Sequence, residues 1–326
     1  MEELLTKAEN MNRLKSKDIF GVWAGSVMCW DEKFRFDVDA YAASVKQLIR
    51  HKPHGIYTTG STGEFYAIDF DEFKVMVDIQ SRLCGEAGIP LQIGCCADAT
   101  HKVVRLLEYA ASKPQVGAAQ VVLPYWMELN NREVVQFFKD MHSACPDLPL
   151  VHYNVARAKQ FLHACDYLKI LEVCPSLVGV KYTSADSKFG SLQNDILATP
   201  MLSYFVGEHM LASGMQIGAR GSYSSVICIS PAYMQKYYAA ATSGKWDQAI
   251  RMQQQVARFL TEVDLLIGKA GEGESDPVVD KAMAVASGFL QAHQRCRPPY
   301  IGWSDKSIAV LRELMIKSFP EFVYSA

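Results

Sequence analysis

The sequence contains the run Leu177-Val178-Gly179-Val180-Lys181, in which small and apolar residues end at a lysine. A near-continuous apolar run indicates a parallel strand covered on both faces, because a strand with one exposed face would alternate. Seven similar runs, rich in Val, Ile and Tyr, lie on both sides of it, and the last is weakened by Ser and Tyr. They span residues 20–27, 55–59, 91–94, 119–123, 150–153, 202–206 and 221–226.

Between these runs the hydrophobic period changes to that of a helix. Residues 38–49 place one apolar stripe, from Val38 to Ile49, on a single face that would cover the sheet. Residues 134–145 repeat this pattern, with Asn130 or Asn131 as the cap before the helix. Eight strands alternating with helices predict an α/β fold of the closed (β/α)8 TIM barrel type.

Beyond about residue 231 the strand pattern stops. Helical patterns continue through residues 236–266, 278–292 and 304–317, and turn signals separate them at 268–274 and 297–299. We therefore expect an N-terminal segment at 1–18, a barrel at 19–230, and a helical C-terminal region at 231–326 that packs on the barrel.

Composition excludes several classes of protein. The 326 residues include 33 basic and 35 acidic side chains, with a net charge of −2 and 49% hydrophobic residues, which is typical of a globular protein without a basic face for nucleic acid. The first eighteen residues lack an apolar core, and no run is long enough to span a membrane, so we expect a cytoplasmic protein. Nine scattered cysteines without a CxxC pair predict reduced thiols and no metal site. Cys95 and Cys96 border either a pocket or, more simply, the core.

In such a barrel the polar residues that end each strand are the first candidates for chemistry. The segment Thr58-Thr59-Gly60-Ser61-Thr62-Gly63-Glu64 follows the second strand. Its backbone N–H groups and the hydroxyls of Ser61 and Thr62 can hold a carboxylate. The alternative is an ordinary turn in which Ser61 or Thr62 caps the next helix. The spacing matches no phosphate-binding motif.

A tyrosine and a lysine end two neighbouring strands. Tyr153 can relay protons at a strand tip, or its ring can simply pack in the barrel. His152 points the other way and is expected to be an interior or interface histidine. Lys181 would normally reach solvent, but in a barrel mouth it is partly desolvated and can supply the free amine that attacks a carbonyl. An enzyme that uses Lys181 in this way forms a Schiff base.

These segments, in this order, resemble motifs of the N-acetylneuraminate lyase and dihydrodipicolinate synthase family. They are GSTGE or GTTGE at residues 60–64, YN at 153–154 and G-[IVL]-K at 179–181, and the likeness extends from about residue 20 to the C-terminus. The resemblance implies a class I lyase, usually tetrameric, in which Lys181 binds pyruvate or another 2-oxo acid as a Schiff base. It implies Tyr153 as the proton relay, Ser61 and Thr62 as carboxylate contacts, and no metal or organic cofactor.

The chain departs from the family pattern at two places. The synthase branch usually reads YNVPxR, whereas here Arg157 comes one position early and Ala158 stands in its slot. The fourth-strand loop commonly ends in two aromatic residues, the second a Tyr lent to a neighbouring subunit. Here they are Tyr125 and Trp126, and because indole cannot relay a hydroxyl proton, Tyr125 becomes a candidate for the relay or a subunit contact.

After the seventh strand, Gly207, Glu208 and His209 resemble the segment in which the lyases bind the hydroxylated tail of the substrate. These residues are therefore candidate substrate contacts, and the alternative is a solvated loop. Ser222 lies in a stretch that resembles the family's GAxGxxS segment and is a further candidate for substrate binding.

We therefore expect a Schiff-base lyase that makes or breaks a C–C bond between a 2-oxo acid, pyruvate first, and an aldehyde. Alternatives are dihydrodipicolinate synthase, a 2-keto-3-deoxy sugar acid aldolase or dehydratase, and a hydratase-aldolase. Tyr125, Trp126 and the Cys-rich third strand leave an apolar acceptor open. A non-catalytic barrel that binds an oxo acid is the alternative of another class, and Lys181 beside Tyr153 counts against it. The expected partners are small molecules and further copies of the chain, as a dimer or tetramer, without nucleic acid or membrane.

Overall fold

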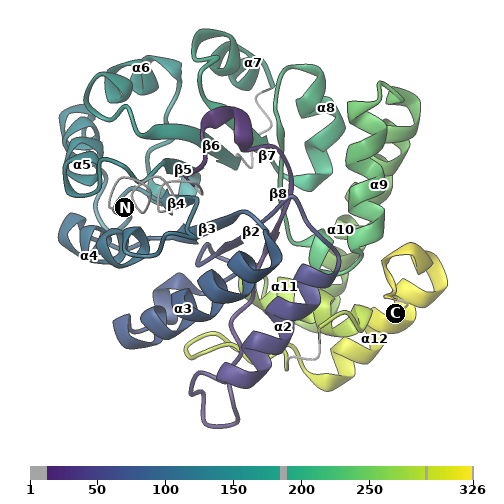
Figure 1. The fold of residues 1–326 in the computed structure, drawn as a ribbon. Helices are drawn as coiled ribbons and strands as arrows, with labels where there is room; N and C mark the ends of the chain where they lie inside the picture. Colours follow the sequence, from purple (N-terminus) through teal and green to yellow (C-terminus); the bar gives the residue numbers. More distant parts are fainter. Residues whose placement is uncertain (1–12, 184–188, 291–292, 325–326) are drawn as a thin grey trace.

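Eight parallel strands close into a barrel in the computed structural model, which describes residues 13–183, 189–290 and 293–324. Each strand pairs with the next along the chain, and β8 pairs with β1 (Figure 1). This arrangement confirms the predicted TIM barrel. The strands are β1 (Gly21–Gly25), β2 (Gly55–Thr58), β3 (Leu91–Gly94), β4 (Ala118–Val121), β5 (Leu150–Val155), β6 (Leu177–Thr183), β7 (Ser203–Val206) and β8 (Gly221–Ser224).

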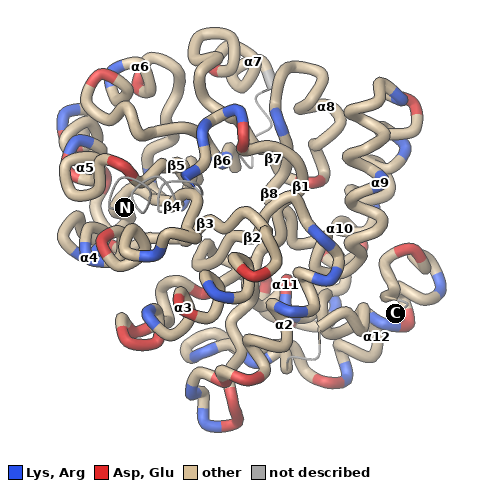
Figure 2. The backbone as a smooth tube through the Cα atoms, viewed as in Figure 1, with Lys and Arg blue, Asp and Glu red and all other residues tan. Residues whose placement is uncertain are grey.

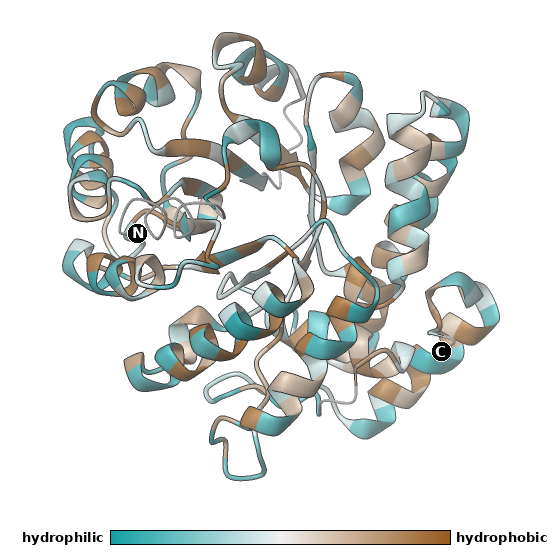
Figure 3. Cartoon of the chain, viewed as in Figure 1, coloured by the Kyte–Doolittle hydropathy of each residue, from teal (hydrophilic) through white to brown (hydrophobic). Residues whose placement is uncertain are grey.

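A ring of helices surrounds the strands, and each helix turns an apolar face inward. Figure 3 shows brown, hydrophobic segments on the strands and mixed colours on the helices, as amphipathic helices over a buried sheet require. The ring consists of α2 (Val38–Arg50), α3 (Phe70–Ala87), α4 (Thr100–Ala111), α5 (Asn131–Ala144), α6 (Ala164–Val173), α7 (Phe189–Ala198) and α8 (Leu211–Gln216).

Helix α5 shows how the sequence sets one of these boundaries. The side-chain oxygen of Asn130 accepts hydrogen bonds from the backbone N–H groups of Arg132 and Glu133, at 3.0 and 3.1 Å. Asn130 is therefore the cap, and Asn131 is the first helical residue.

The inside of the barrel is a packed core of its own. Trp23 packs edge-on against Phe205 and Tyr223, with ring centroids 6.4 and 5.9 Å apart. Ile19, which precedes β1, is fully buried in this cluster, and its carbonyl accepts a hydrogen bond of 2.6 Å from the Ser203 hydroxyl. The amino ends of the strands are thus filled, and the side chains that end the strands face the opposite mouth.

The rest of the described chain is helical and lies beside the barrel and across part of its mouth (Figure 1). It contains α9 (Pro231–Thr242), α10 (Trp246–Ala270), α11 (Asp276–Ser287) and α12 (Asp305–Ser318). The expected pattern at 236–266 is divided between two helices because the chain turns at Gly244, where φ is 72°. Of the expected helical stretch 278–292, residues 291 and 292 lie outside the described part.

Charged residues of both signs are mixed over the outside of the protein. Figure 2 shows Lys and Arg interspersed with Asp and Glu over the outer helices rather than gathered on one face. Within the described residues, no helix is long and apolar enough to cross a membrane. All nine cysteines are free, and Cys165 alone among them is exposed. Cys95 and Cys96 are 0% and 4% exposed and pack in the core, and Cys96 also lines a pocket.

Candidate active site at the barrel mouth

Lys181 ends the central part of β6 and reaches the mouth beside Tyr153 of β5. The two residues are register partners in neighbouring parallel strands, so their side chains leave the same face of the sheet. The Lys181 Nζ lies 4.1 Å from the centroid of the Tyr153 ring and 4.9 and 5.6 Å from those of Tyr57 and Tyr223. Lys181 forms no ion pair with any residue that the structure describes. Aromatic rings therefore surround its amine, and the Asp276 carboxylate, whose pKa the charge of Lys181 helps to lower, forms no ion pair with it.

Ser61 joins this pair from the loop after β2. The Ser61 Oγ lies 3.1 Å from the Tyr153 Oη, within hydrogen-bonding distance, and Tyr153 is only 3% exposed. A hydroxyl that shares a hydrogen bond with a buried phenol can pass a proton to it or take one from it. The structure thus brings together Lys181, Tyr153 and Ser61, which the sequence singled out separately.

The loop after β2 is held in shape by close backbone contacts. A Cβ atom on Gly63 would lie 2.6 Å from the backbone nitrogen of Thr59, so only glycine lets the loop fold back here. Helix α3 is capped by Asp69 rather than by a residue of this loop. The alternative in which Ser61 or Thr62 caps the next helix is therefore wrong, and both side chains face the mouth region instead.

Glu64, at the end of this loop, joins the loop to α11. Its buried carboxylate accepts hydrogen bonds from the Trp30 indole, from the backbone N–H of Arg297 at 3.0 Å, and from the Lys281 ammonium. Lys281 is 1% exposed and also donates to the Arg295 carbonyl at 2.7 Å. Both charges are thus paired and hydrogen-bonded, as a buried ion pair must be to persist.

Thr62 points toward α11. Its hydroxyl donates a 2.6 Å hydrogen bond to the carboxylate of Asp280. Burial raises the pKa of Asp280 to about 7, and the carboxylate of Asp276 adds to this rise, while the bond from Thr62 opposes it. The sequence predicted Thr62 as a carboxylate contact, and in this structure the hydrogen of that hydroxyl is directed to Asp280.

Arg157 also faces α11, where it forms a fork with Asp276. The two guanidinium nitrogens lie 2.6 and 2.9 Å from the two carboxylate oxygens. Burial tends to raise the pKa of Asp276, but the hydrogen bonds from Arg157 and its charge leave that pKa lowered. Arg157 is thus at the mouth, one position earlier than in the synthase pattern, with both nitrogens of its fork bonded to a carboxylate.

A pocket of about 280 Å³ opens above these groups. Ser61, Tyr153, Arg157 and Asp276 form its polar part. Its wall is aromatic, with Phe65, Tyr66, Tyr125 and Tyr300. This volume is near the lower end of small-molecule sites, so it suits a compact ligand.

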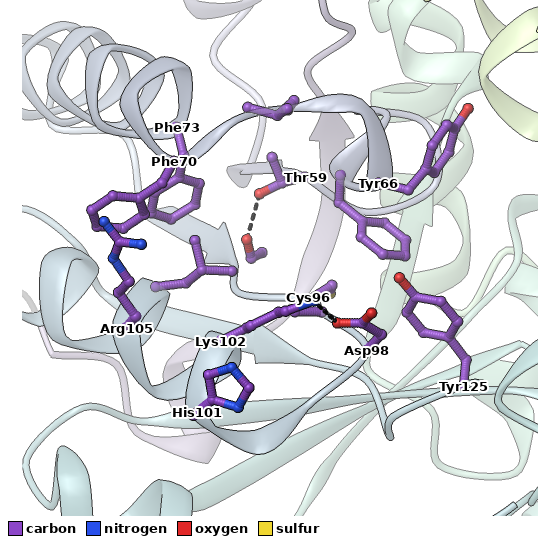
Figure 4. Close-up of a pocket in the computed structure, with 15 residues that line it drawn as sticks. Thr59, Tyr66, Phe70, Phe73, Cys96, Asp98, His101, Lys102, Arg105 and Tyr125 are labelled. Carbon is purple, nitrogen blue, oxygen red and sulfur yellow. Dashed lines mark hydrogen bonds and ion pairs between the residues drawn. The ribbon is translucent and has the colours of Figure 1, made fainter. Parts of the chain in front are cut away.

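Tyr125 belongs to two pockets at once. It lines the pocket over Tyr153 and also a second one of about 470 Å³ at the carboxyl ends of β2 and β3, between α3 and α4. In Figure 4, Tyr125 and Arg105 lie on opposite sides of this second pocket, and Lys102 pairs with Asp98 along its edge. Neither Lys181 nor Tyr153 lines the second pocket. Trp126, next to Tyr125, is 76% exposed.

The predicted substrate contacts after β7 lie in a different setting. Glu208 is buried, and one of its oxygens accepts hydrogen bonds from the hydroxyl and backbone N–H of Ser225 and from the backbone N–H of Val226. It therefore holds the loop after β8. His209 is exposed and its ring packs against Gly207 of its own loop. No hydrogen bond or ion pair among the described residues joins these three residues to Lys181 or Tyr153.

The structure does not bear out the expectation that Ser222 faces the substrate. The ring of Tyr223 points into the barrel, where it contacts Tyr57 and Gln92. Because side chains alternate along a strand, Ser222 points outward to the helices. Its geometry gives no support to the prediction that Ser222 binds substrate.

Sequence reasoning missed the polar groups that α11 and the barrel interior supply. Asp276 and Asp280 are four residues apart on one helix, a spacing that places both carboxylates on one face. That spacing was a usable signal, but the sequence did not tell which part of the barrel α11 covers. Gln92 and Gln120, both fully buried inside the barrel, were hidden within apolar runs. Among the described residues, no three His, Cys, Asp or Glu side chains are arranged to hold a metal ion.

Comparison with known proteins places this site in a family. The sequence model described as "Dihydrodipicolinate synthetase family" matches residues 18–315 of the chain. The chain belongs to the dihydrodipicolinate synthetase family. The resemblance seen in the sequence motifs is thereby confirmed.

Relatives within the dihydrodipicolinate synthetase family differ in their names. A 4-hydroxy-tetrahydrodipicolinate synthase of Phenylobacterium zucineum is 28% identical, over 68% of this chain and 75% of its own length. YagE, a prophage protein of the dihydrodipicolinic acid synthase family from E. coli K12, solved with pyruvate, has a TM-score of 0.81 at 18% identity and covers 92% of this chain and 98% of its own.

A third neighbour is the sialic acid aldolase of Ruminococcus gnavus, with a TM-score of 0.80 at 19% identity over 94% of this chain and 99% of its own. At such identities the solved structures show the fold. The family match adds that this chain is a member of a family of lyases and aldolases, whose named relatives include both synthases and aldolases.

Proposed function

We propose that this protein is a class I lyase that forms a Schiff base between Lys181 and a 2-oxo acid, with pyruvate as the first candidate, and makes or breaks a C–C bond to an aldehyde. The observation that carries the proposal is the amine of Lys181, unpaired by any described carboxylate and 4.1 Å from the ring of Tyr153, whose hydroxyl meets Ser61. An amine and a relayed phenol side by side are what imine chemistry requires.

The steps follow from these groups. The neutral amine attacks C2 of the 2-oxo acid to give a carbinolamine. Tyr153 gives its proton to the hydroxyl that leaves as water, which yields a protonated imine and a phenolate. In the cleavage direction Tyr153 takes the proton of the C4 hydroxyl, the C3–C4 bond breaks, and its electron pair moves into the enamine as the aldehyde leaves. Protonation at C3 and hydrolysis release pyruvate and restore Lys181. The imine itself accepts the electrons, so the proposal needs no metal or organic cofactor.

The acceptor side of the pocket supports an aldehyde without a second carboxylate. Bidentate recognition of a carboxylate needs a free guanidinium fork, and the fork of Arg157 is bonded to Asp276. The aromatic wall of the pocket fits an uncharged aldehyde. We therefore place the protein nearer the aldolases than the synthase, with a hydroxylated 2-oxo acid as the substrate that is cleaved.

The Schiff base is tested by incubation with pyruvate and borohydride, followed by intact mass and peptide mapping. We expect one adduct, at Lys181, and none in Lys181→Ala. Lys159→Ala is the matched control, because the Lys159 amine also lies at the mouth, where it donates to the Trp126 carbonyl. An adduct that maps to another lysine would overturn the assignment.

The acceptor is tested on one preparation by two assays. We expect retro-aldol cleavage of hydroxylated 2-oxo acids to exceed condensation of pyruvate with aspartate semialdehyde. A condensation kcat/KM of about 10⁴ M⁻¹s⁻¹ or more, ordinary for an enzyme on its own substrate, would restore the synthase, the function named for several relatives.

We further propose that the protein is a homo-oligomer in a reducing compartment, the cytoplasm. Exposed Trp126 and Met127, 76% and 70% accessible beside the mouth, support an apolar contact with a second copy. The nine free cysteines support the compartment. Sedimentation of the wild type and of Trp126→Glu measures the first point, and an unchanged assembly in that variant would move the contact elsewhere.

A further inference from the structure

A line of hydrogen bonds runs across the inside of the barrel. The Tyr223 hydroxyl donates to the Gln92 Oε1 at 2.7 Å, and the Gln92 Nε2 donates to the Gln120 Oε1 at 3.3 Å. Burial raises the pKa of Tyr223, so the phenol keeps the proton that it donates to Gln92. The line therefore has a direction, from Tyr223 through Gln92 to Gln120.

The line ends in a donor with no acceptor. Gln120 is 0% exposed, and its Nε2 has no hydrogen-bond partner among the described residues. Turning over the Gln120 amide alone would not help, because two NH₂ groups would then face each other between Gln92 and Gln120. A buried donor without an acceptor destabilises the folded state, so such a group calls for an explanation.

The free amide lies beside the amine of Lys181. A Cβ atom placed on Gly60 would be 3.4 Å from the Gln120 Nε2, 3.5 Å from the Tyr57 ring and 3.8 Å from the Lys181 Nζ. All of these distances are ordinary contact distances, so the three groups border one small space next to Gly60. The amide of Gln120 and the amine of Lys181 face this space from two strands, β4 and β6.

The other donors around this space are largely committed. The Ser61 hydroxyl is shared with Tyr153, and the Thr62 hydroxyl donates to Asp280. Three carboxylates, those of Asp276, Asp280 and Glu208, lie in the same region. An anionic ligand at Gly60 therefore needs a donor that is not already bonded to a side chain.

We propose that the Gln120 Nε2 donates a hydrogen bond to the carboxylate of the 2-oxo acid joined to Lys181. The inference rests on the proposed Schiff-base function. The carboxylate of a 2-oxo acid is one bond from the carbon that the amine attacks, so it falls in the space that Gln120 faces. A neutral amide accepts no proton from the imine and adds no competing cation. Gln120 thus helps to distinguish a 2-oxo acid from a simple ketone.

The test compares the pyruvate concentration that gives half-maximal borohydride trapping in wild type and Gln120→Leu. Hydrogen bonds to charged groups are strong, so we expect this concentration to rise about 10- to 100-fold. Gln120→Asn, which keeps an amide on a shorter side chain, should raise this concentration less than Gln120→Leu does. With methyl pyruvate, whose ester carries no charge, wild type and Gln120→Leu should differ far less.

A matched control separates binding from stability. Gln80 is also 0% exposed, but it lies on α3 outside the barrel and its amide donates to the Tyr41 hydroxyl at 2.8 Å. Gln80→Leu should lower the melting temperature without changing pyruvate trapping. Gln120→Leu should weaken pyruvate trapping without lowering the melting temperature. In this variant the Gln92 Nε2 loses its acceptor, but the unpaired Gln120 Nε2 is removed, so the number of unpaired buried donors stays the same.

The outcomes keep the two proposals apart. If wild type traps no 2-oxo acid at Lys181, the proposed function fails, and this inference fails with it. If wild type traps pyruvate and Gln120→Leu traps it at the same concentration, the function stands and the inference is wrong. Equal losses with pyruvate and methyl pyruvate would also overturn it, because the amide would then act on packing rather than on the carboxylate.

Discussion

Lys181 and Lys281 both lie near the mouth of the barrel, and their surroundings differ in every respect that governs reactivity. Lys281 is 1% exposed, forms an ion pair with Glu64 and donates to the Arg295 carbonyl. Lys181 faces the rings of Tyr57, Tyr153 and Tyr223 and pairs with no described carboxylate. A buried ammonium bonded to a carboxylate and a carbonyl stabilises structure, whereas an amine among aromatic rings can reach a substrate.

Removing Lys181 should give the largest effect on activity and almost none on stability. Lys181→Met retains the aliphatic part of the side chain and removes the nucleophile, so we expect turnover to fall by at least about 10⁴-fold. The melting temperature should stay within a few degrees of wild type. Stopped-flow kinetics measures the turnover and calorimetry the melting temperature, on the same sample. A large loss of stability would show that Lys181, like Lys281, stabilises the fold.

Removing Lys281 should do the opposite. Lys281→Met leaves the buried carboxylate of Glu64 without its partner, and breaking such a pair costs about 3–5 kcal/mol of unfolding free energy. The double variant Glu64→Gln/Lys281→Met should recover most of that loss, because no unpaired charge remains. Denaturant unfolding measures both. If Lys281→Met unfolds at the same denaturant concentration as wild type, the claim that Lys281 serves stability is wrong.

Tyr153 should affect the proton transfers near Lys181 more than the imine itself. We expect Tyr153→Phe to lower kcat by about 10²-fold or more, the usual scale for general acid–base catalysis, with a smaller change in pyruvate trapping. Ser61→Ala, which removes the hydroxyl 3.1 Å from the phenol, should act in the same direction. Near-normal turnover in Tyr153→Phe would move the relay to another residue, with Tyr125 examined next.

Asp280 should give the smallest effect, and it depends on pH. Its pKa is raised to about 7, so it is protonated below that pH and can donate to Thr62, which frees the Thr62 hydrogen for a ligand carboxylate. Above pH about 7 the ionised carboxylate of Asp280 accepts the Thr62 hydrogen again, and its negative charge repels the carboxylate of the ligand. We expect pyruvate trapping to weaken about tenfold per unit of pH there, and Asp280→Asn to remove most of this dependence. A profile unchanged by the substitution would assign the titration to another group.

The same group has a defined effect on stability. Because the pKa of Asp280 is higher in the folded chain than its ordinary value of 3.8, the folded state holds the extra proton between those two values. Its contribution to stability is complete below pH about 4 and is lost as the pH rises through about 7. Asp280→Asn should therefore stabilise the protein more above pH 7 than at acidic pH, as thermal unfolding at the two pH values can measure.

The sequence alone was sufficient to predict which residues at the carboxyl ends of the strands come together. Lys181, Tyr153 and Ser61 could be found because parallel strands of a barrel bring their carboxyl ends to one mouth, whatever the distance along the chain. The expectation for Ser222 came from a motif resemblance, which does not tell which face of the strand a residue occupies. Tyr223 takes the inward face, so Ser222 points outward. Asp276, Asp280 and the bond between Arg157 and Asp276 depend on where α11 docks. Local periodicity does not encode that position.

The segment that closes the amino end of the barrel has a consequence for the order in which the chain assembles. Ile19 binds the Ser203 hydroxyl, the carbonyls of Ser16 and Lys17 accept hydrogen bonds from Arg220, and β1 pairs with β8. Residues 16–21 are therefore synthesised some two hundred residues before the partners that they bind. Contacts this distant in sequence slow folding, so closure of the ring is expected to be its late step. Until then the edges of the first and last strands remain open to pairing with other chains.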